Sequence, residues 1–197
     1  MAVTADDVKK LRQMTGAGIM DCKNALKETD GDVDKAVELL RKKGIAKAEK
    51  KAGRETKEGI IDAYIHPGSK LGVLLEVNCE TDFVAKTDDF KSFVRDIAMQ
   101  IAAANPMVVR REEVPQDIIE REMAIYKTQA ENEKKPAHIA EKIATGRLEK
   151  FYQEVVLMEQ SFVKDPNMTI EQLVKETIGK IGENISVRRF SRFQLGE

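Results

Sequence analysis

Residues 71–104 change from an alternating to a helical hydrophobic pattern, and this change constrains the fold more than any other feature of the sequence. Alternate positions from Val73 to Cys79 are apolar, which is typical of a strand with one buried face. Between Phe90 and Ala102, apolar residues recur at the spacing of a helix with one buried side. The sequence therefore predicts a strand, a tight turn at 81–83 and a long helix that begins near Asp88.

The turn between this strand and this helix carries an unusual aromatic residue. Thr81 and Asp82 favour turns and helix N-termini, and Phe83 follows them directly. Two interpretations are open for Phe83. The burial preference of aromatic side chains favours a core position beneath the turn. A place at the tip of a turn between two rigid elements favours an exposed anchor for a partner protein.

The flanking segments complete an α+β core domain over residues 59–197. Residues 59–66 alternate and predict a strand that pairs with 71–80 as a hairpin, and 185–193 predicts a further strand with outward arginines. Helical patterns after Pro115 predict a short helical hairpin, whereas 155–163 fits either a helix or a strand. We expect an antiparallel sheet covered by helices.

The N-terminal segment predicts a separate module of three short helices over residues 1–45. Thr4 and Asp7 have the spacing of a capping box, and the third helix is expected to end at Gly44. The glycines at 16 and 18 are better explained as a turn between helices than as a phosphate-binding loop, because no strand precedes them. Residues 46–58 are then a charged linker.

Composition excludes several classes of function. The only cysteines and histidines are Cys22, Cys79, His66 and His138, and their spacing matches no metal site or catalytic triad. The sequence therefore predicts no catalytic residue, no metal and no cofactor. It also predicts no membrane helix and no signal peptide, and hence a cytoplasmic protein with reduced thiols.

A basic stretch leaves a second class of function open. Residues 41–57 contain eight basic and two acidic residues, and the last predicted strand carries Arg188, Arg189 and Arg192. Such residues would bind RNA phosphates, or the ribosome, without sequence preference. A solvated linker is the more favoured interpretation, so we expect nucleic-acid binding to be unlikely.

Two longer motifs resemble the elongation factor Ts family of bacteria and organelles. The first is Leu11–Lys23 (LRQMTGAGIMDCK), and the second is Glu76–Ala85 (EVNCETDFVA). The resemblance covers the whole chain and is weakest between Met107 and Phe162. It implies that the N-terminal module is similar to a ubiquitin-associated domain. It also implies guanine-nucleotide exchange on the GTPase elongation factor Tu, with no chemical step of its own.

The resemblance assigns roles to two sets of residues. Thr81, Asp82, Phe83 and Val84 would meet helices of the GTPase and displace magnesium indirectly, with Asp82 as the polar contact and Phe83 as the wedge. In the N-terminal module, the contact residues implied by the family are Ile19, Met20 and Lys23. From the residues alone, a core position for Met20 and a solvated place for Lys23 are favoured instead.

The length of the chain corresponds to the short form of this family. There is room for one core unit and a short helical hairpin, whereas longer members have a second core subdomain and a protruding coiled coil. An unpaired sheet edge favours pairing across a two-fold axis. We therefore expect a homodimer.

Overall fold

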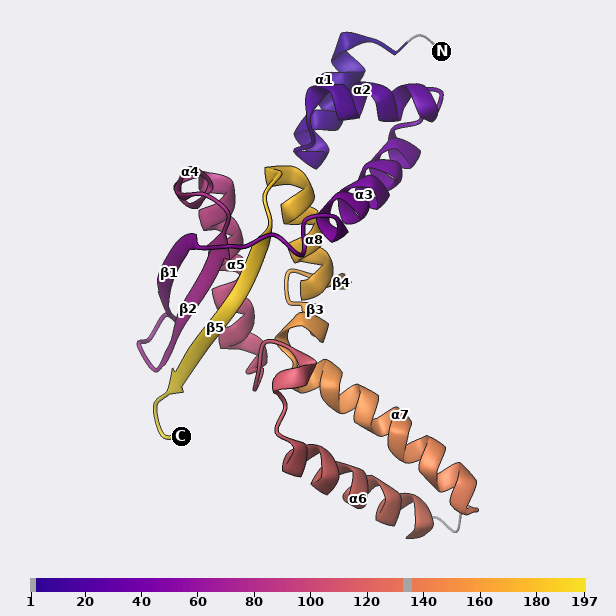
Figure 1. Ribbon diagram of the computed structural model, residues 1–197, viewed down its shortest axis with the longest axis vertical. Helices are drawn as coiled ribbons and strands as arrows, with labels where there is room; N and C mark the ends of the chain where they lie inside the picture. Colours follow the sequence, from indigo (N-terminus) through magenta and orange to yellow (C-terminus); the bar gives the residue numbers. More distant parts are fainter. Residues whose placement is uncertain (1–2, 133–135) are drawn as a thin grey trace. The chain divides into compact units, whose positions relative to one another are not determined.

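The computed structural model describes residues 3–132 and 136–197 and has the predicted α+β fold (Figure 1). The α-helices are α1 (Ala5–Thr15), α2 (Ile19–Glu28), α3 (Val33–Glu49), α4 (Asp82–Ala85), α5 (Asp88–Ala104), α6 (Gln116–Asn132), α7 (Ala137–Val155) and α8 (Ile170–Ile181). The strands are β1 (Glu58–Ile65), β2 (Leu71–Cys79), β3 (Ser161–Phe162), β4 (Asp165–Thr169) and β5 (Ile185–Gln194). Two short 3-10 helices are η1 (Arg111–Glu113) and η2 (Leu157–Glu159).

The larger sheet has the strand order β1-β2-β5, and β3 and β4 form a second, two-stranded antiparallel sheet. The predicted hairpin of β1 and β2 is confirmed, and at its end the His66 N–H donates to the Leu71 carbonyl over 2.9 Å. The alternating side chains of β2 from Val73 to Cys79 are all buried, as the sequence pattern predicts. The apolar residues of β1 differ, because Ile61 and Ile65 are exposed while Tyr64 is buried.

The chain divides into two compact units. The first comprises Met1–Ile60, Val77–Phe93 and Gln172–Ser186. The second comprises Ile61–Glu76, Val94–Glu171 and Val187–Glu197. The predicted division into domains at residues 1–45, 46–58 and 59–197 stays a prediction.

The three N-terminal helices of the first unit share one small core. Its buried side chains are Val8, Leu11, Cys22, Ala25, Leu26, Ala36 and Leu40. The predicted capping box at the start of α1 is confirmed, since the Asp7 N–H donates to Thr4 Oγ1 and the Thr4 N–H donates to Asp7 Oδ2. This reciprocal pair satisfies two N–H groups that the first turn of a helix leaves unpaired.

The predicted end of the third helix at Gly44 is wrong, because α3 continues to Glu49. At Gly44 the backbone of α3 packs closely against α8. A Cβ atom built on Gly179 of α8 would lie 2.9 Å from the Gly44 Cα atom. The missing side chain of Gly179 therefore permits α8 to approach the backbone of α3 closely inside the first unit, whereas a Cβ atom on Gly44 would meet nothing within 4 Å, and Gly44 does not end the helix.

Further contacts join α3 and the residues after it to α8. Arg41 Nε lies 2.5 Å from Glu176 Oε1, and Lys51 Nζ donates to the Gly182 carbonyl just beyond α8. Part of the predicted linker thus belongs to α3, and the residues after it are bonded to the segment that follows α8.

The C-terminal strand and the ambiguous segment are also settled. β5 forms the third strand of the larger sheet, as predicted, with Arg188 and Arg189 exposed. The prediction that Arg192 faces outward is wrong, because its side chain is only 10% exposed and pairs with Glu197. After α7 ends at Val155, the chain forms η2, β3 and β4, so the segment is neither a longer helix nor a single strand.

The predicted helical hairpin consists of α6 and α7 in the second unit (Figure 1). Its core contains Val114, Leu148, Tyr152 and Val156, with Ile119 and Met123 of α6 among the half-buried side chains packed against it. Arg111 of η1 is bonded at the same time to Glu149 and Glu159, and its guanidinium lies over the Tyr152 ring. The base of the hairpin is therefore held by charge pairs as well as by apolar packing.

Candidate partner-binding site

The turn after β2 exposes the aromatic side chain that the sequence singles out. Phe83 is 79% exposed on α4, whereas Ala85 on the same short helix is buried and Val84 is half-buried. Thr81 is the N-cap of α4, and its hydroxyl accepts the Val84 N–H over 3.4 Å. The interpretation of Phe83 as a core residue is therefore wrong, and the ring is free of the core.

A carboxylate from the far end of the chain holds Thr81. The Thr81 N–H donates to Glu183 Oε2 over 2.9 Å, and the Thr81 hydroxyl donates to Glu183 Oε1 over 2.7 Å. Glu183 follows α8 in the loop before β5, and its side chain is half-buried. Hydrogen bonds to a charged acceptor are stronger than those between neutral groups. Both donors of one residue are thus bound by a single carboxylate.

Residues next to Thr81 and Glu183 form a second set of contacts. The Asn184 N–H donates to Glu80 Oε1 over 2.6 Å, and Arg54 lies beside the same carboxylate. The Asn184 side-chain amide donates to the Arg54 carbonyl over 2.8 Å. The hydrogen bond from Asn184, helped by the charge of Arg54, lowers the pKa of Glu80 below its ordinary value. Glu80 is therefore ionised at neutral pH, and it joins three segments of the first unit.

Cys79, at the end of β2, supports the turn from the buried side. Its Sγ donates to the Thr81 carbonyl over 3.1 Å. Burial, with a smaller effect from the negative charge of Glu183, raises the pKa of the Cys79 thiol to about 11. The thiol therefore stays protonated at neutral pH and serves as a donor, not as a nucleophile.

The polar residue of the turn is already paired. Lys86 Nζ donates to Asp82 Oδ2 over 2.6 Å, and this bond lowers the pKa of Asp82. Both side chains are well exposed, so the pair is weak and open to exchange with another partner. Beyond it, the Thr87 hydroxyl accepts the Phe90 N–H, and α5 begins at Asp88 as predicted.

The N-terminal site residues lie together on α2, where Ile19, Met20 and Lys23 are all exposed. Met20 is 61% exposed, so the interpretation of Met20 as a core residue is wrong. Met14 at the end of α1 is exposed as well, and the sequence analysis did not single it out. Within residues 3–132 and 136–197, no hydrogen bond or ion pair joins α2 to α4. The two sets of site residues thus lie on different helices, α2 and α4.

The main residue missed by sequence reasoning is Glu183. It lies 102 positions after Thr81, and no local pattern marks it. Glu80 was inside the recognised motif but had no role assigned to it.

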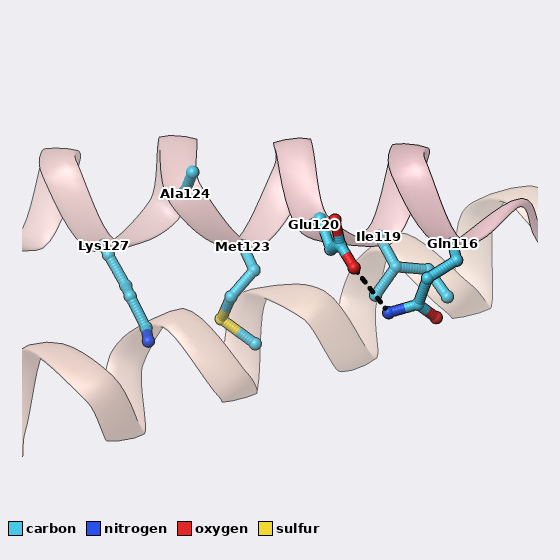
Figure 2. Close-up of a pocket in the computed structure, with 6 residues that line it drawn as sticks. All are labelled: Gln116, Ile119, Glu120, Met123, Ala124 and Lys127. Atoms are coloured by element: carbon cyan, nitrogen blue, oxygen red, sulfur yellow. Dashed lines mark hydrogen bonds between the residues drawn. The ribbon is translucent and has the colours of Figure 1, made fainter.

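Further features of the described residues bear on other kinds of site. Within the part of the chain that the structure describes, no cluster of three His, Cys, Asp or Glu side chains is arranged to hold a metal ion. No described helix is long and apolar enough to cross a membrane. A pocket along α6, lined by Ile119 and Met123 among others, has a mainly apolar surface, with a Gln116–Glu120 hydrogen bond along its wall (Figure 2).

The comparison with known families agrees with the resemblance carried by both motifs. The family model described as "Elongation factor TS" matches residues 2–197. The chain belongs to the elongation factor Ts family. Its members are translation elongation factors, and the matched range includes both motifs and Glu183.

Relatives named elongation factor Ts resemble this chain over nearly all of its length. The protein of Carboxydothermus hydrogenoformans is 62% identical over 195 residues, which is 99% of this chain and 90% of the relative. The protein of Geobacter sulfurreducens is 60% identical over 197 residues, covering 100% of this chain and 91% of the relative. The protein of Caldanaerobacter subterraneus is 56% identical over 195 residues, which is 99% of this chain and 98% of the relative. The resemblance to this family predicted from the sequence is confirmed.

Proposed function

We propose that this protein is a guanine-nucleotide exchange factor for elongation factor Tu. The observation that carries the proposal is the exposed ring of Phe83, placed on a turn whose backbone is bonded on several sides. A large apolar side chain that is exposed in the free protein and held in place is a typical interface anchor. Membership of the elongation factor Ts family supports the GTPase as its partner.

The mechanism follows from thermodynamic linkage. If this protein binds the nucleotide-free GTPase more tightly than the GDP-bound form, its binding must weaken GDP by the same factor. Phe83 enters the GTPase surface as the wedge, while Asp82 exchanges its Lys86 partner for a polar group of the GTPase. Thr81 and Val84 hold the wedge at the surface. Magnesium and GDP then leave, and GTP binds in their place.

This protein supplies no chemical step and needs no cofactor in this scheme. It acts only through the free energy of binding to the GTPase, so the proposal requires neither a nucleophile nor a nucleotide site on this chain. The protonated Cys79 thiol fits a structural role. A cytoplasmic location follows from the same proposal, because the GTPase acts in translation.

The exposed residues of α2 form a second contact surface in this proposal. Ile19 and Met20 expose apolar side chains, and Lys23 lies one helical turn further along. Two separate patches bind more tightly together than either alone when one rigid partner meets both. Loss of the α2 patch is then expected to weaken binding without changing the action of Phe83.

The direct test is the release of labelled GDP from purified elongation factor Tu, measured with and without this protein. A concentration-dependent acceleration is expected. The labelled nucleotide itself must be recovered unchanged, because this protein performs no hydrolysis. Unaccelerated release at micromolar concentrations, with both proteins folded, would overturn the proposal.

We also propose a homodimer, and the support comes from the exposed face of the larger sheet. Ile61 and Ile65 of β1 and Leu74 of β2 are all exposed in the second unit. Contiguous exposed apolar side chains are typical of an interaction surface. Sedimentation of natural protein and of Leu74→Lys is the test, with the equally exposed Val163→Lys as control. A monomeric natural protein would contradict the dimer.

The RNA-binding alternative has less support. The basic side chains along residues 41–57 are largely paired with acidic groups of the same chain, including Arg41–Glu176, Lys43–Glu28, Lys47–Asp21 and Arg54–Glu80. Paired cations in a protein of net charge -1 make a poor phosphate surface. RNA binding that is tight and falls steeply with salt would favour this alternative.

A further inference from the structure

We propose that Glu183 is the positioning residue for the exposed turn: its carboxylate holds Thr81 so that Phe83 stays in a binding-competent place. The proposal rests on the proposed function, in which Phe83 meets the GTPase. Its basis is the pair of hydrogen bonds from the Thr81 N–H and hydroxyl to the two oxygens of Glu183.

The turn needs support from outside, because α4 is only four residues long. A helix of this length is unstable by itself, since the first turn fixes several dihedral angles for very few hydrogen bonds. Phe83 is too exposed to hold the backbone by its own packing. The direction of its side chain therefore depends on how the neighbouring residues of the turn are anchored.

Thr81 is the residue through which this anchoring is made. Its N–H and its hydroxyl both donate to Glu183, and its carbonyl accepts from the Cys79 thiol. Of these contacts, only the two to Glu183 have an ionised acceptor, and such bonds are the stronger kind. Because the same hydroxyl is the N-cap of α4, Glu183 acts on the start of the helix that carries Phe83.

Glu183 is itself held on both sides. The Gly182 carbonyl accepts from Lys51 Nζ, and the Asn184 N–H donates to Glu80. The Asn184 side chain is buried and is bonded to the Arg54 carbonyl. The carboxylate is therefore presented to Thr81 from a fixed loop, which is what a positioning group requires.

A positioning role predicts a distinct kinetic result. Without Glu183, the turn spends part of its time in conformations that do not bind, and the apparent dissociation constant rises in inverse proportion to the competent fraction. At a saturating concentration of the variant, every GTPase is bound to a competent turn. The saturating rate of GDP release is therefore the same as with the natural protein. Removing the Phe83 ring, by contrast, removes the wedge itself and lowers the saturating rate.

The test uses the full chain with Glu183→Gln, compared with Glu176→Gln as a matched control on α8. A glutamine keeps one acceptor but turns an NH₂ group toward a Thr81 donor, so one of the two bonds is lost. We expect roughly a tenfold rise in the concentration for half-maximal GDP release, at an unchanged saturating rate. Backbone amides of 81–85 are expected to exchange hydrogen faster in the free variant, with normal exchange in the control.

A double variant shows whether Glu183 acts through the turn. Glu183→Gln combined with Phe83→Ala is expected to need no higher concentration for half-maximal GDP release than Phe83→Ala alone, because there is no ring left to position. If Glu183→Gln does not fold, Thr81→Val removes the hydroxyl bond to Glu183 together with the N-cap bond from the Val84 N–H, keeps the Thr81 N–H bond to Glu183, and is expected to give the same kinetic pattern.

Several results would overturn the proposal. One is an unchanged amide exchange and half-maximal concentration in Glu183→Gln. Another is a defect that multiplies with that of Phe83→Ala, or one explained by the unfolded fraction alone. If the natural protein does not accelerate GDP release, the proposed function fails together with the binding role of Glu183. Amide exchange in the free variant then still shows whether Glu183 orders the turn, so the two failures are distinguishable.

Discussion

Gly179 of α8 packs against the backbone of Gly44 in α3, with the Gly44 Cα atom only 2.9 Å from where a Cβ atom on Gly179 would stand. The approach requires the missing side chain of Gly179, whereas a Cβ atom on Gly44 would have open space. The contact lies four residues before Glu183 and joins the helix that leads out of the N-terminal module to the helix that leads to the turn support. A methyl group added at Gly179 should therefore lower the stability of the protein.

The first prediction is that Gly179→Ala destabilises the protein. The new methyl group meets backbone atoms of Gly44, which cannot move aside without shifting α3. Overpacking of this kind costs about 1–3 kcal/mol of unfolding free energy. The measurement is urea unfolding. The control is Gly146→Ala in α7, where a Cβ atom would have open space, so that variant should gain about 0.5–1 kcal/mol. Equal effects at both sites would contradict the close approach.

The course of α3 shows why a glycine misleads sequence reasoning. Gly44 was expected to end the helix, because glycine is common at helix C-termini. Instead α3 continues, and its backbone at Gly44 packs against Gly179, which is far away in the sequence, so no local pattern reveals the contact. The alternating residues of β2 and the capping box of α1 were predicted correctly, because their causes are local.

The second prediction concerns acid stability and Glu80. Its pKa is lowered in the folded protein from an ordinary value of 4.5, so its contribution is present above that pH and is lost as the pH falls through the lowered pKa. In Glu80→Gln, the side-chain oxygen still accepts the Asn184 N–H, but the charge is gone. The natural protein should be more stable than the variant at pH 7, and the difference should shrink in acid. Urea unfolding at a series of pH values checks this, and a constant difference would contradict it.

The third prediction is that the start of β5 belongs to the core while its end does not. Ile185 is buried, and Leu195, just beyond the strand, is exposed. Ile185→Ala should therefore cost about 2–5 kcal/mol of stability, because it leaves a cavity. Leu195→Ala is the matched control and should stay within about 0.5 kcal/mol. Removal of residues 185–197 should be worse than either. Thermal melts of the three proteins test this, and an unchanged melt after removal would show that the tail is an arm on the surface.

The fourth prediction is that a chain beginning at Gly59 keeps a cooperative melt but binds elongation factor Tu more weakly. The N-terminal helices have their own small core. Their removal therefore takes contacts from the remaining residues but leaves the core of those residues in place. The melt should nevertheless be lower, since Asn184 and Gly182 lose their partners at Arg54 and Lys51. Calorimetry and GDP release measure the two effects. A chain without a cooperative transition would show that the predicted domain boundary is misplaced.

The candidate site shows the same limit of local reasoning. Phe83 was expected at the tip of a turn, and the resemblance to a family favoured its exposure; both Phe83 and Met20 are indeed exposed. Hydrophobicity alone would have placed Met20 in the core. Glu183 could not be predicted, because one acidic residue after a glycine near a helix end resembles any solvated loop residue. Its role arises only when the fold brings residue 183 to Thr81.

The last prediction contrasts two phenylalanines on either side of Thr87. Phe90 is fully buried, so Phe90→Ala should cost about 3–5 kcal/mol of stability. Phe83 is 79% exposed, so Phe83→Ala should leave the melt of the free protein nearly native. Its defect is expected in stimulated GDP release. An aromatic anchor is worth about 2–4 kcal/mol at an interface, or roughly thirty- to a thousandfold in rate.

The paired measurement is the melting temperature and the rate of stimulated GDP release for each variant. Phe193→Ala is the control for a ring that is exposed but lies outside the turn, and it should have native values in both measurements. Asp82→Ala should show a weaker form of the Phe83→Ala defect, because its side chain can leave Lys86 for the GTPase. A large drop in melting temperature for Phe83→Ala, with full nucleotide exchange by the folded fraction, would contradict the role of Phe83 as a wedge. A native melt with slow release would support it, because a ring that does little for the fold would then be needed for the partner.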